Sequence, residues 1–254
     1  MKCKIAILFF CILVFFNMQV FCENPSSTTT LPDANSTTTT TTVTLPQDSS
    51  VTTTLPTEEI PPSLEAILNG VEKRYAGPGF IASFDQKSTL KAMEITDTAL
   101  GKVFIRRPGM MRWEYETPEK QIIITDGRTL WMYRPDDNQV MIGNAPSYFG
   151  DGKGANFLSD IKMIRESFNV IIEKKNDPHF HILKLLPKEG KLDISHIYLW
   201  ISKLTSDVVR VITYNSYGDE TIIDMNNLQF NQNLDSSLFT FKVPEGTDIL
   251  QLED

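Results

Sequence analysis

The side chains that could do chemistry here are, first, two close histidines and two close glutamates. His179 and His181 are two residues apart, so on a strand they would share one face and could bind a metal. No cysteine is spaced beside them as a further ligand, and an exposed strand face is the simpler interpretation. Glu114 and Glu116 share a face in the same way, but the carboxylates of a glycosidase must face each other across a cleft. Spacing along one strand gives no evidence of such a cleft.

Signature sequences of enzymes are absent from the chain. It has no phosphate-binding P-loop, no nucleophile elbow, no paired-histidine zinc helix and no glycine-rich dinucleotide turn. A hydrolase that uses Asp126 or His196 remains an alternative of another class, although no nucleophile–base pair can be named for it. The three cysteines are Cys3, Cys11 and Cys22. Because all three lie in the first 22 residues, the rest of the chain lacks cysteines for a disulfide or a metal site. The sequence therefore predicts a protein that is not an enzyme and uses no cofactor.

Four short apolar segments between residues 100 and 138 are each closed by a turn signal. They are predicted strands at 103–106, 111–116, 121–125 and 129–133. The Asp126-Gly127 pair between two of them is typical of a type I′ hairpin, which needs positive φ at both central positions. In the second segment, Met111, Trp113 and Tyr115 point to one side and the charged residues between them to the other. This meander predicts a curved sheet with one apolar face.

Further strands and two short helices are predicted around the meander. The strands are 80–84, 168–173, 180–186, 194–202, 208–214, 220–230 and 239–243. The first helix begins after Ser63 and ends at Gly77, and its apolar face carries Leu64, Ile67, Leu68, Val71 and Tyr75. The second is marked by Phe157, Leu158, Ile161 and Ile164. Consecutive strands with few helices predict an α+β, mainly antiparallel fold: a single strongly curved sheet, or incomplete barrel, with an amphipathic helical lid.

The N-terminal part of the chain has a different composition. Lys2 and Lys4 precede an apolar run from Ile5 to Phe16, which is typical of a cleaved export signal. An uncleaved anchor and lipid attachment at Cys22 stay open, although the apolar run is short for a spanning helix. The next segment is rich in threonine and repeats Thr-Leu-Pro, which predicts either a disordered tether or a tolerated insertion. The predicted parts are a signal peptide at 1–22, a disordered linker at 23–62 and a folded domain at 63–254.

The charge of the chain limits its partners. Its formal net charge is -8, and removal of the two lysines of the signal takes it to -10. Nucleic acids bind to basic surfaces, so no nucleic-acid partner is predicted. A monomer is expected.

The meander and its flanks also resemble a known family. The matching strings are Arg107-Pro108-Gly109-x-x-Arg112-Trp113-Glu114-Tyr115, then Pro118, then Ile124-Thr125-Asp126-Gly127-x-x-Leu130-Trp131-x-Tyr133. Further matches are Phe80 to Gln86 and the C-terminal Leu238-Phe239-x-Phe241-x-x-Pro244-x-Gly246. In this order and spacing they resemble the periplasmic outer-membrane lipoprotein carrier family (LolA-like), over about residues 62–250.

The resemblance implies a periplasmic chaperone that binds the acyl chains of lipoproteins in a hydrophobic cavity and moves them from the inner to the outer membrane. Its partners would be acylated lipoproteins, an inner-membrane ABC-type release complex and possibly an outer-membrane acceptor lipoprotein. The alternative is a membrane-anchored acceptor or another lipid-binding relative of the same fold. Arg107 would donate hydrogen bonds to carbonyls of the lid and lock it. The residues expected to line the cavity are Leu68, Val71, Phe84, Met111, Trp113, Tyr115, Trp131, Phe157 and Ile161.

Overall fold

The computed structural model describes residues 62–146, 158, 161–173, 177–188 and 194–252. The predicted signal peptide and, apart from Pro62, the predicted linker lie outside these ranges. The helices are α1 (Leu64–Arg74), η1 (Pro135–Asp137), α3 (Met163–Ser167) and η4 (Ser236–Phe239). The first six strands are β1 (Gly79–Leu90), β2 (Ile95–Arg106), β3 (Met110–Thr117), β4 (Gln121–Thr125), β5 (Thr129–Arg134) and β6 (Gln139–Asn144). The others are β7 (Phe168–Ile172), β8 (Phe180–Pro187), β9 (Ile194–Ser202), β10 (Val208–Asn215), β11 (Glu220–Phe230) and β12 (Asp248–Gln251).

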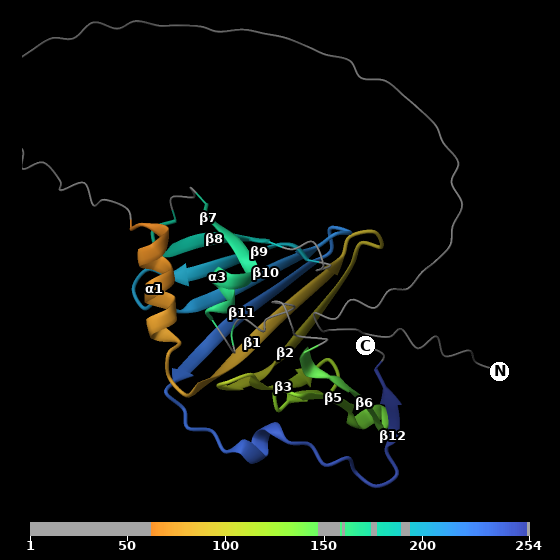
Figure 1. Cartoon of the computed structure of the whole chain (residues 1–254). Coiled ribbons are helices and arrows are strands. Elements are labelled where there is room, and N and C mark those ends of the chain that lie inside the picture. The colour runs from red at the N-terminus through yellow and green to blue at the C-terminus, as the bar shows by residue number, and fades with distance from the viewer. Residues whose placement is uncertain (1–61, 147–157, 159–160, 174–176, 189–193, 253–254) are drawn as a thin grey trace, which may run out of the picture. The chain divides into compact units, whose positions relative to one another are not determined.

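All these strands belong to one curved sheet (Figure 1). Its order is β12-β6-β5-β4-β3-β2-β1-β11-β10-β9-β8-β7, so most strands pair with their neighbours in sequence. The pairings are antiparallel apart from β12 with β6, which is parallel. Within the described ranges, β7 and β12 end the sheet without pairing with each other, which leaves it open. The predicted fold class is therefore confirmed.

One face of the sheet carries the apolar core. Across β1 to β5, the residues Ala82, Val103, Trp113, Ile123 and Met132 are paired in a row, and all five are buried. Ile67, Leu68, Val71 and Tyr75 of the first helical segment belong to the same cluster. We call this the inner face, and the opposite one the outer face. Successive side chains on a strand point to opposite faces of the sheet. This row therefore shows which residues of β1 to β5 lie on the inner face and which on the outer face.

Helix α1 is capped at its start and anchored at its end. The Ser63 hydroxyl accepts a hydrogen bond from the Ala66 N–H at 3.2 Å, as predicted for an N-cap. At the other end, Arg74 pairs with Asp207 at 2.5 Å. The Tyr75 hydroxyl accepts a hydrogen bond from the Val208 N–H at 3.1 Å, and burial raises the pKa of that phenol. These contacts fix the C-terminal end of α1 to the β9–β10 turn.

The second helix differs from the prediction. The helix α3 begins at Met163, so Ile161 lies in a turn before it, and Phe157 lies outside the described residues. Leu158, Ile161 and Ile164 are nevertheless buried in the inner cluster. Among the described residues, the apolar spacing thus identified the buried side chains, and the α-helix begins at Met163. Of the helices in the described ranges, none is long and apolar enough to cross a membrane.

Three further local predictions are wrong. Residues 239–243 do not form a strand, because that segment finds no strand partner; it follows η4 along the outer face. Strand β6 was not predicted, because Gly143 and Asn144 suggest a loop, yet it pairs with β5 along its whole length. The Asp126-Gly127 turn is not type I′, since only Gly127 has positive φ. Asp126 instead accepts hydrogen bonds from the N–H groups of Arg128 and Thr129, at 2.8 and 2.7 Å.

Candidate functional site

The candidate site is the inner face with its cover. Most residues predicted to line a cavity lie there and are almost completely buried, with 1 to 7% of their surface exposed: Leu68, Val71, Phe84, Met111, Trp113, Tyr115 and Ile161. Three further buried methionines join Met111, namely Met132, Met141 and Met225. Methionine side chains adapt to contacts of varied shape. The arrangement can therefore accept flexible apolar groups once the cover is displaced.

Three aromatic side chains form the centre of this face. The ring of Phe84 lies 5.0 Å from the rings of Trp113 and Tyr115, edge-on to both. Gly101 makes room for them, because a Cβ there would lie 2.7 Å from the Phe84 ring and 2.1 Å from the Glu114 carbonyl oxygen. The group thus depends on a strand residue without a side chain.

A polar contact crosses this apolar surface. The Tyr115 hydroxyl donates to the Gln86 side-chain oxygen at 3.0 Å, and the Gln86 amide donates to the Ser88 hydroxyl at 3.1 Å. Gln86 is only 4% exposed, so its hydrogen bonds offset the cost of burying an amide. The contact lies toward the end of β3 that is opposite Arg107.

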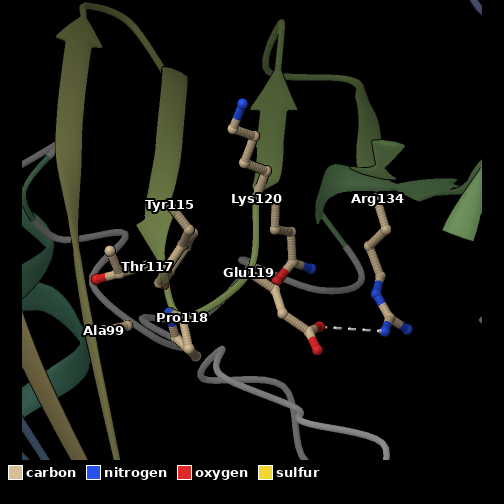
Figure 2. Close-up of a pocket in the computed structure, with 8 residues that line it drawn as sticks. Ala99, Tyr115, Thr117, Pro118, Glu119, Lys120 and Arg134 are labelled. Carbon is tan, nitrogen blue, oxygen red and sulfur yellow. Dashed lines mark ion pairs between the residues drawn. The ribbon is translucent and has the colours of Figure 1, made fainter. Parts of the chain in front are cut away.

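A recess opens to solvent at that same end (Figure 2). It is shallow, and it is lined by Ala99, Tyr115, Thr117, Pro118, Glu119, Lys120, Gln121 and Arg134. Arg134 pairs with Glu119 at 3.8 Å and with Asp137 at 2.5 Å. Because Tyr115 belongs both to this recess and to the inner face, the recess reaches the edge of the apolar cluster from outside.

The cover of the inner face consists of α1, Leu158 and the segment Ile161–Ser167, which we call the lid. Its buried residues are Ile67, Leu68, Val71, Leu158, Ile161 and Ile164. Since they form one cluster with the sheet, a ligand reaches the surface beneath the lid by displacing it.

Arg107 lies where the sheet meets the lid, directly after β2. Its Nη1 donates to the Gly77 carbonyl at 2.6 Å, and its Nη2 donates to the Leu158 carbonyl at 3.4 Å. The guanidinium also lies 5.9 Å from the centre of the Tyr75 ring. One half-buried arginine thus joins the end of β2 to the turn that follows α1, through Gly77, and to Leu158 of the lid.

The prediction for Trp131 is wrong. Leu130 and Met132 are the buried inner-face residues of β5, and Trp131 between them is half-buried on the outer face beside Ile124. Alternation along the strand places Trp131 on the face opposite Leu130 and Met132. Phe157, the remaining predicted residue, lies outside the described ranges.

The outer face has a small apolar cluster of its own. Ile124, Val140 and Phe239 are each at most 1% exposed and lie outside the inner cluster. The segment around η4 covers them: the ring of Phe241 lies 5.1 Å from that of Tyr133. We call residues 236–241 the strap.

The residues considered for catalysis do not converge. Asp126 closes the β4–β5 turn, whereas His196 lies on the outer face of β9 and stacks on Tyr214 at 4.7 Å between ring centres. Five strands separate β4 from β9 in the sheet. Glu114 pairs with Arg112 at 2.5 Å and Glu116 with Lys102 at 3.2 Å. In the described ranges, no three His, Cys, Asp or Glu side chains gather as metal ligands would.

The family model of the outer membrane lipoprotein carrier protein LolA matches residues 78–242. The chain belongs to the LolA family. The matched range contains Arg107 and β1 to β11, while α1 precedes it. The family assignment therefore rests on the sheet rather than on the first helix of the lid.

Individual relatives in the LolA family are about 30% identical to this chain over most of their own length. An outer-membrane lipoprotein carrier protein of Azotobacter vinelandii is 30% identical over 151 residues, 59% of this chain and 71% of the relative. One from Neisseria meningitidis serogroup C is 30% identical over 172 residues, 68% of this chain and 80% of the relative. Among solved structures, a LolA superfamily protein from Nitrosomonas europaea has a TM-score of 0.43 at 15% identity, covering 70% of this chain and 97% of that one.

Proposed function

We propose that this protein is a periplasmic carrier that binds the acyl chains of lipoproteins on its inner face and moves them from the inner to the outer membrane. The observation that carries the proposal is the contiguous apolar cluster between sheet and lid, with Arg107 joining the two. Relatives named as outer-membrane lipoprotein carrier proteins support lipoproteins as the cargo.

The free energy gained by burying an acyl chain exceeds the free energy needed to open the lid. A hydrogen bond from a charged donor stabilises a protein by about 1.5–3 kcal/mol, so Arg107 holds the lid with a modest free energy. Burial of one CH₂ group contributes about 0.8 kcal/mol, so about four methylenes offset one such bond. An acyl chain has several times that number. Cargo can therefore displace the lid, and the lid closes again when the chains leave.

Such a carrier needs no covalent chemistry, and we infer that it is not an enzyme. Transfer follows from differences in affinity between successive partners. We infer that cargo arrives from an inner-membrane ABC-type release complex and leaves to an outer-membrane acceptor lipoprotein. The acidic net charge of -8 is consistent with a protein that does not adhere to anionic membrane surfaces.

The test is native mass spectrometry of the purified protein with a triacylated lipopeptide and with the same peptide unacylated. The wild type should bind the acylated form and not the other. Arg107→Leu should retain the lipopeptide about tenfold more tightly, because the closed empty state loses hydrogen bonds that the loaded state does not need.

Arg112→Leu is the matched control. Arg112 also donates to a backbone carbonyl, that of Leu238 at 3.2 Å, but it does so on the outer face. Its variant should bind the lipopeptide as the wild type does. Equal binding of acylated and unacylated peptide would overturn the proposal, and equal retention by both variants would remove the role of Arg107.

A further inference from the structure

The two helical parts of the lid are joined by one side chain, Arg165 of α3. Its Nη1 donates to a Glu65 carboxylate oxygen at 2.7 Å, and its Nη2 donates to the Asn69 side-chain oxygen at 2.8 Å. Its Nε donates to a Glu72 carboxylate oxygen. The three donor positions of the guanidinium are thus all used on a single partner helix. Arginine suits this task because its planar fork can satisfy several acceptors at once.

The acceptors form a stripe on α1. Glu65, Asn69 and Glu72 are four and three residues apart, so they lie above one another over two turns. The core residues Ile67 and Val71 point elsewhere on the same helix. The contact with α3 is therefore separate from the apolar packing of α1 on the sheet.

The two helices are held to the sheet by different means. Arg74, Tyr75 and the Arg107 contact with Gly77 fix the end of α1 to the sheet. The five residues of α3 bury a single side chain, Ile164. The C-terminal end of α3 is also held by Lys188, whose N–H donates to the Ser167 carbonyl at 2.9 Å and whose Nζ donates to the Arg165 carbonyl at 2.6 Å. With fewer buried side chains, α3 is the less firmly packed of the two helices.

We propose that Arg165 is a positioning residue that latches α3 onto α1 and so controls access to the inner face. This inference rests on the proposed function, in which the inner face holds the acyl chains. Opening then means that α3 leaves α1, while α1 stays on the sheet. The hydrogen bond of Glu72 and the nearby Glu65 raise the pKa of the Arg165 guanidinium, so the latch keeps its charge at every physiological pH.

The latch differs from the Arg107 contact in its sensitivity to salt. The Glu65 side chain is 69% exposed and that of Glu72 28%, so dissolved ions screen both pairs. Arg107 donates to uncharged carbonyls, and those bonds respond little to ionic strength. Salt should therefore loosen α3 without releasing Arg107.

The experiment measures two rates on the whole protein, wild type and Arg165→Gln. The first is the uptake of a fluorescent triacylated lipopeptide, at low and at high salt. Uptake by Arg165→Gln should be about three to ten times faster at low salt, the range expected for a small network of exposed ion pairs. High salt should accelerate the wild type toward the variant and leave the variant unchanged.

The second rate is backbone hydrogen exchange without ligand, which does not depend on the proposed function. In Arg165→Gln, exchange should accelerate in peptides that contain α3 and stay constant in peptides that contain α1. Arg165→Lys keeps the positive charge but loses the planar guanidinium. Its rate of exchange in α3 should lie between those of the wild type and Arg165→Gln. The reversed pair, Arg165→Glu with Glu72→Arg, should slow uptake again relative to Arg165→Glu.

The outcomes separate the two proposals. Unchanged exchange of α3 in Arg165→Gln would overturn the latch, and so would equal acceleration in α1, because the helices would then open as one unit. Failure of the wild type to take up lipopeptide, with α3 still released in the variant, would overturn the carrier function and leave the coupling of the helices intact.

Discussion

The two faces of this sheet are covered in different ways. On the inner face, the lid closes over one large apolar cluster that extends across most strands. On the outer face, the strap covers a small cluster around Phe239 on β4 and β6. Each cover receives a hydrogen bond from an arginine of the meander to a backbone carbonyl, from Arg107 to Leu158 inside and from Arg112 to Leu238 outside.

An arginine–carbonyl contact is therefore found at both covers of the sheet. By itself the contact is no sign of a movable lid, because the strap has one too. What distinguishes Arg107 is that it holds two separate segments over buried apolar surface, and that a polar latch joins those segments. The strap is one continuous segment, and the side chain of its own Phe239 is completely buried. We therefore expect the inner face to open and the outer face to stay closed.

The largest effect should come from Phe84→Ala on the inner face. The change leaves a cavity beside Trp113 and Tyr115, so the free energy of unfolding should fall by about 3–5 kcal/mol. Urea denaturation measures it. An acylated ligand that fills the vacated space should restore part of the loss, whereas the unacylated peptide should restore none. A loss below about 1 kcal/mol would show that the inner face is loosely packed and adapts to the change.

Phe239→Ala makes the equivalent change in the strap itself. We expect a loss of about 3 kcal/mol, at the low end for phenylalanine, because the strap can collapse onto the vacated space. Lipopeptide affinity, measured by fluorescence titration of the folded protein, should stay unchanged. Weaker binding would mean that the two faces are coupled through β4, and that the outer face takes part in the function.

The elements that could be predicted from the sequence are those with a regular apolar periodicity. The boundaries of α1, β4, β9 and β11 follow from apolar spacing and turn residues, which are local properties. The inner-face position of Met111, Trp113 and Tyr115 follows from the same alternation. Partners distant in sequence could not be predicted. Phe239 and Phe241 alternate like strand residues, but a strand also needs a neighbour to pair with, and the strap has none.

The lid shows the same limit at the level of single contacts. Family resemblance indicated Arg107, and the structure gives its two carbonyl acceptors. Nothing in the sequence indicated Arg165, because its acceptors lie about 100 residues away, at a spacing that many solvent-exposed helices share. Only the fold brings that arginine to α1.

The smallest effect should come from two histidines, one on each face. His181 shares the face of Leu183 and Leu185, whereas His196 lies on the outer face. Burial lowers the pKa of each, with help from the charges of Lys203 and Lys184, respectively. Since the folded pKa is below the unfolded value of about 6.5, stability is complete above that pH and is lost as the pH falls through the folded pKa.

The unfolding free energy of the wild type should therefore fall between about pH 7 and about pH 5, and replacement of either histidine by glutamine should make this fall smaller. The difference should be less than about 1 kcal/mol, because both rings are partly exposed. Urea denaturation across that range measures the slopes. The same measurement with saturating lipopeptide compares the two faces. If acyl chains fill only the inner face, the contribution of His196 to the pH dependence of stability should stay unchanged. A change in that contribution on binding would show that the outer face of β9 responds to cargo, contrary to a sheet that opens on one side.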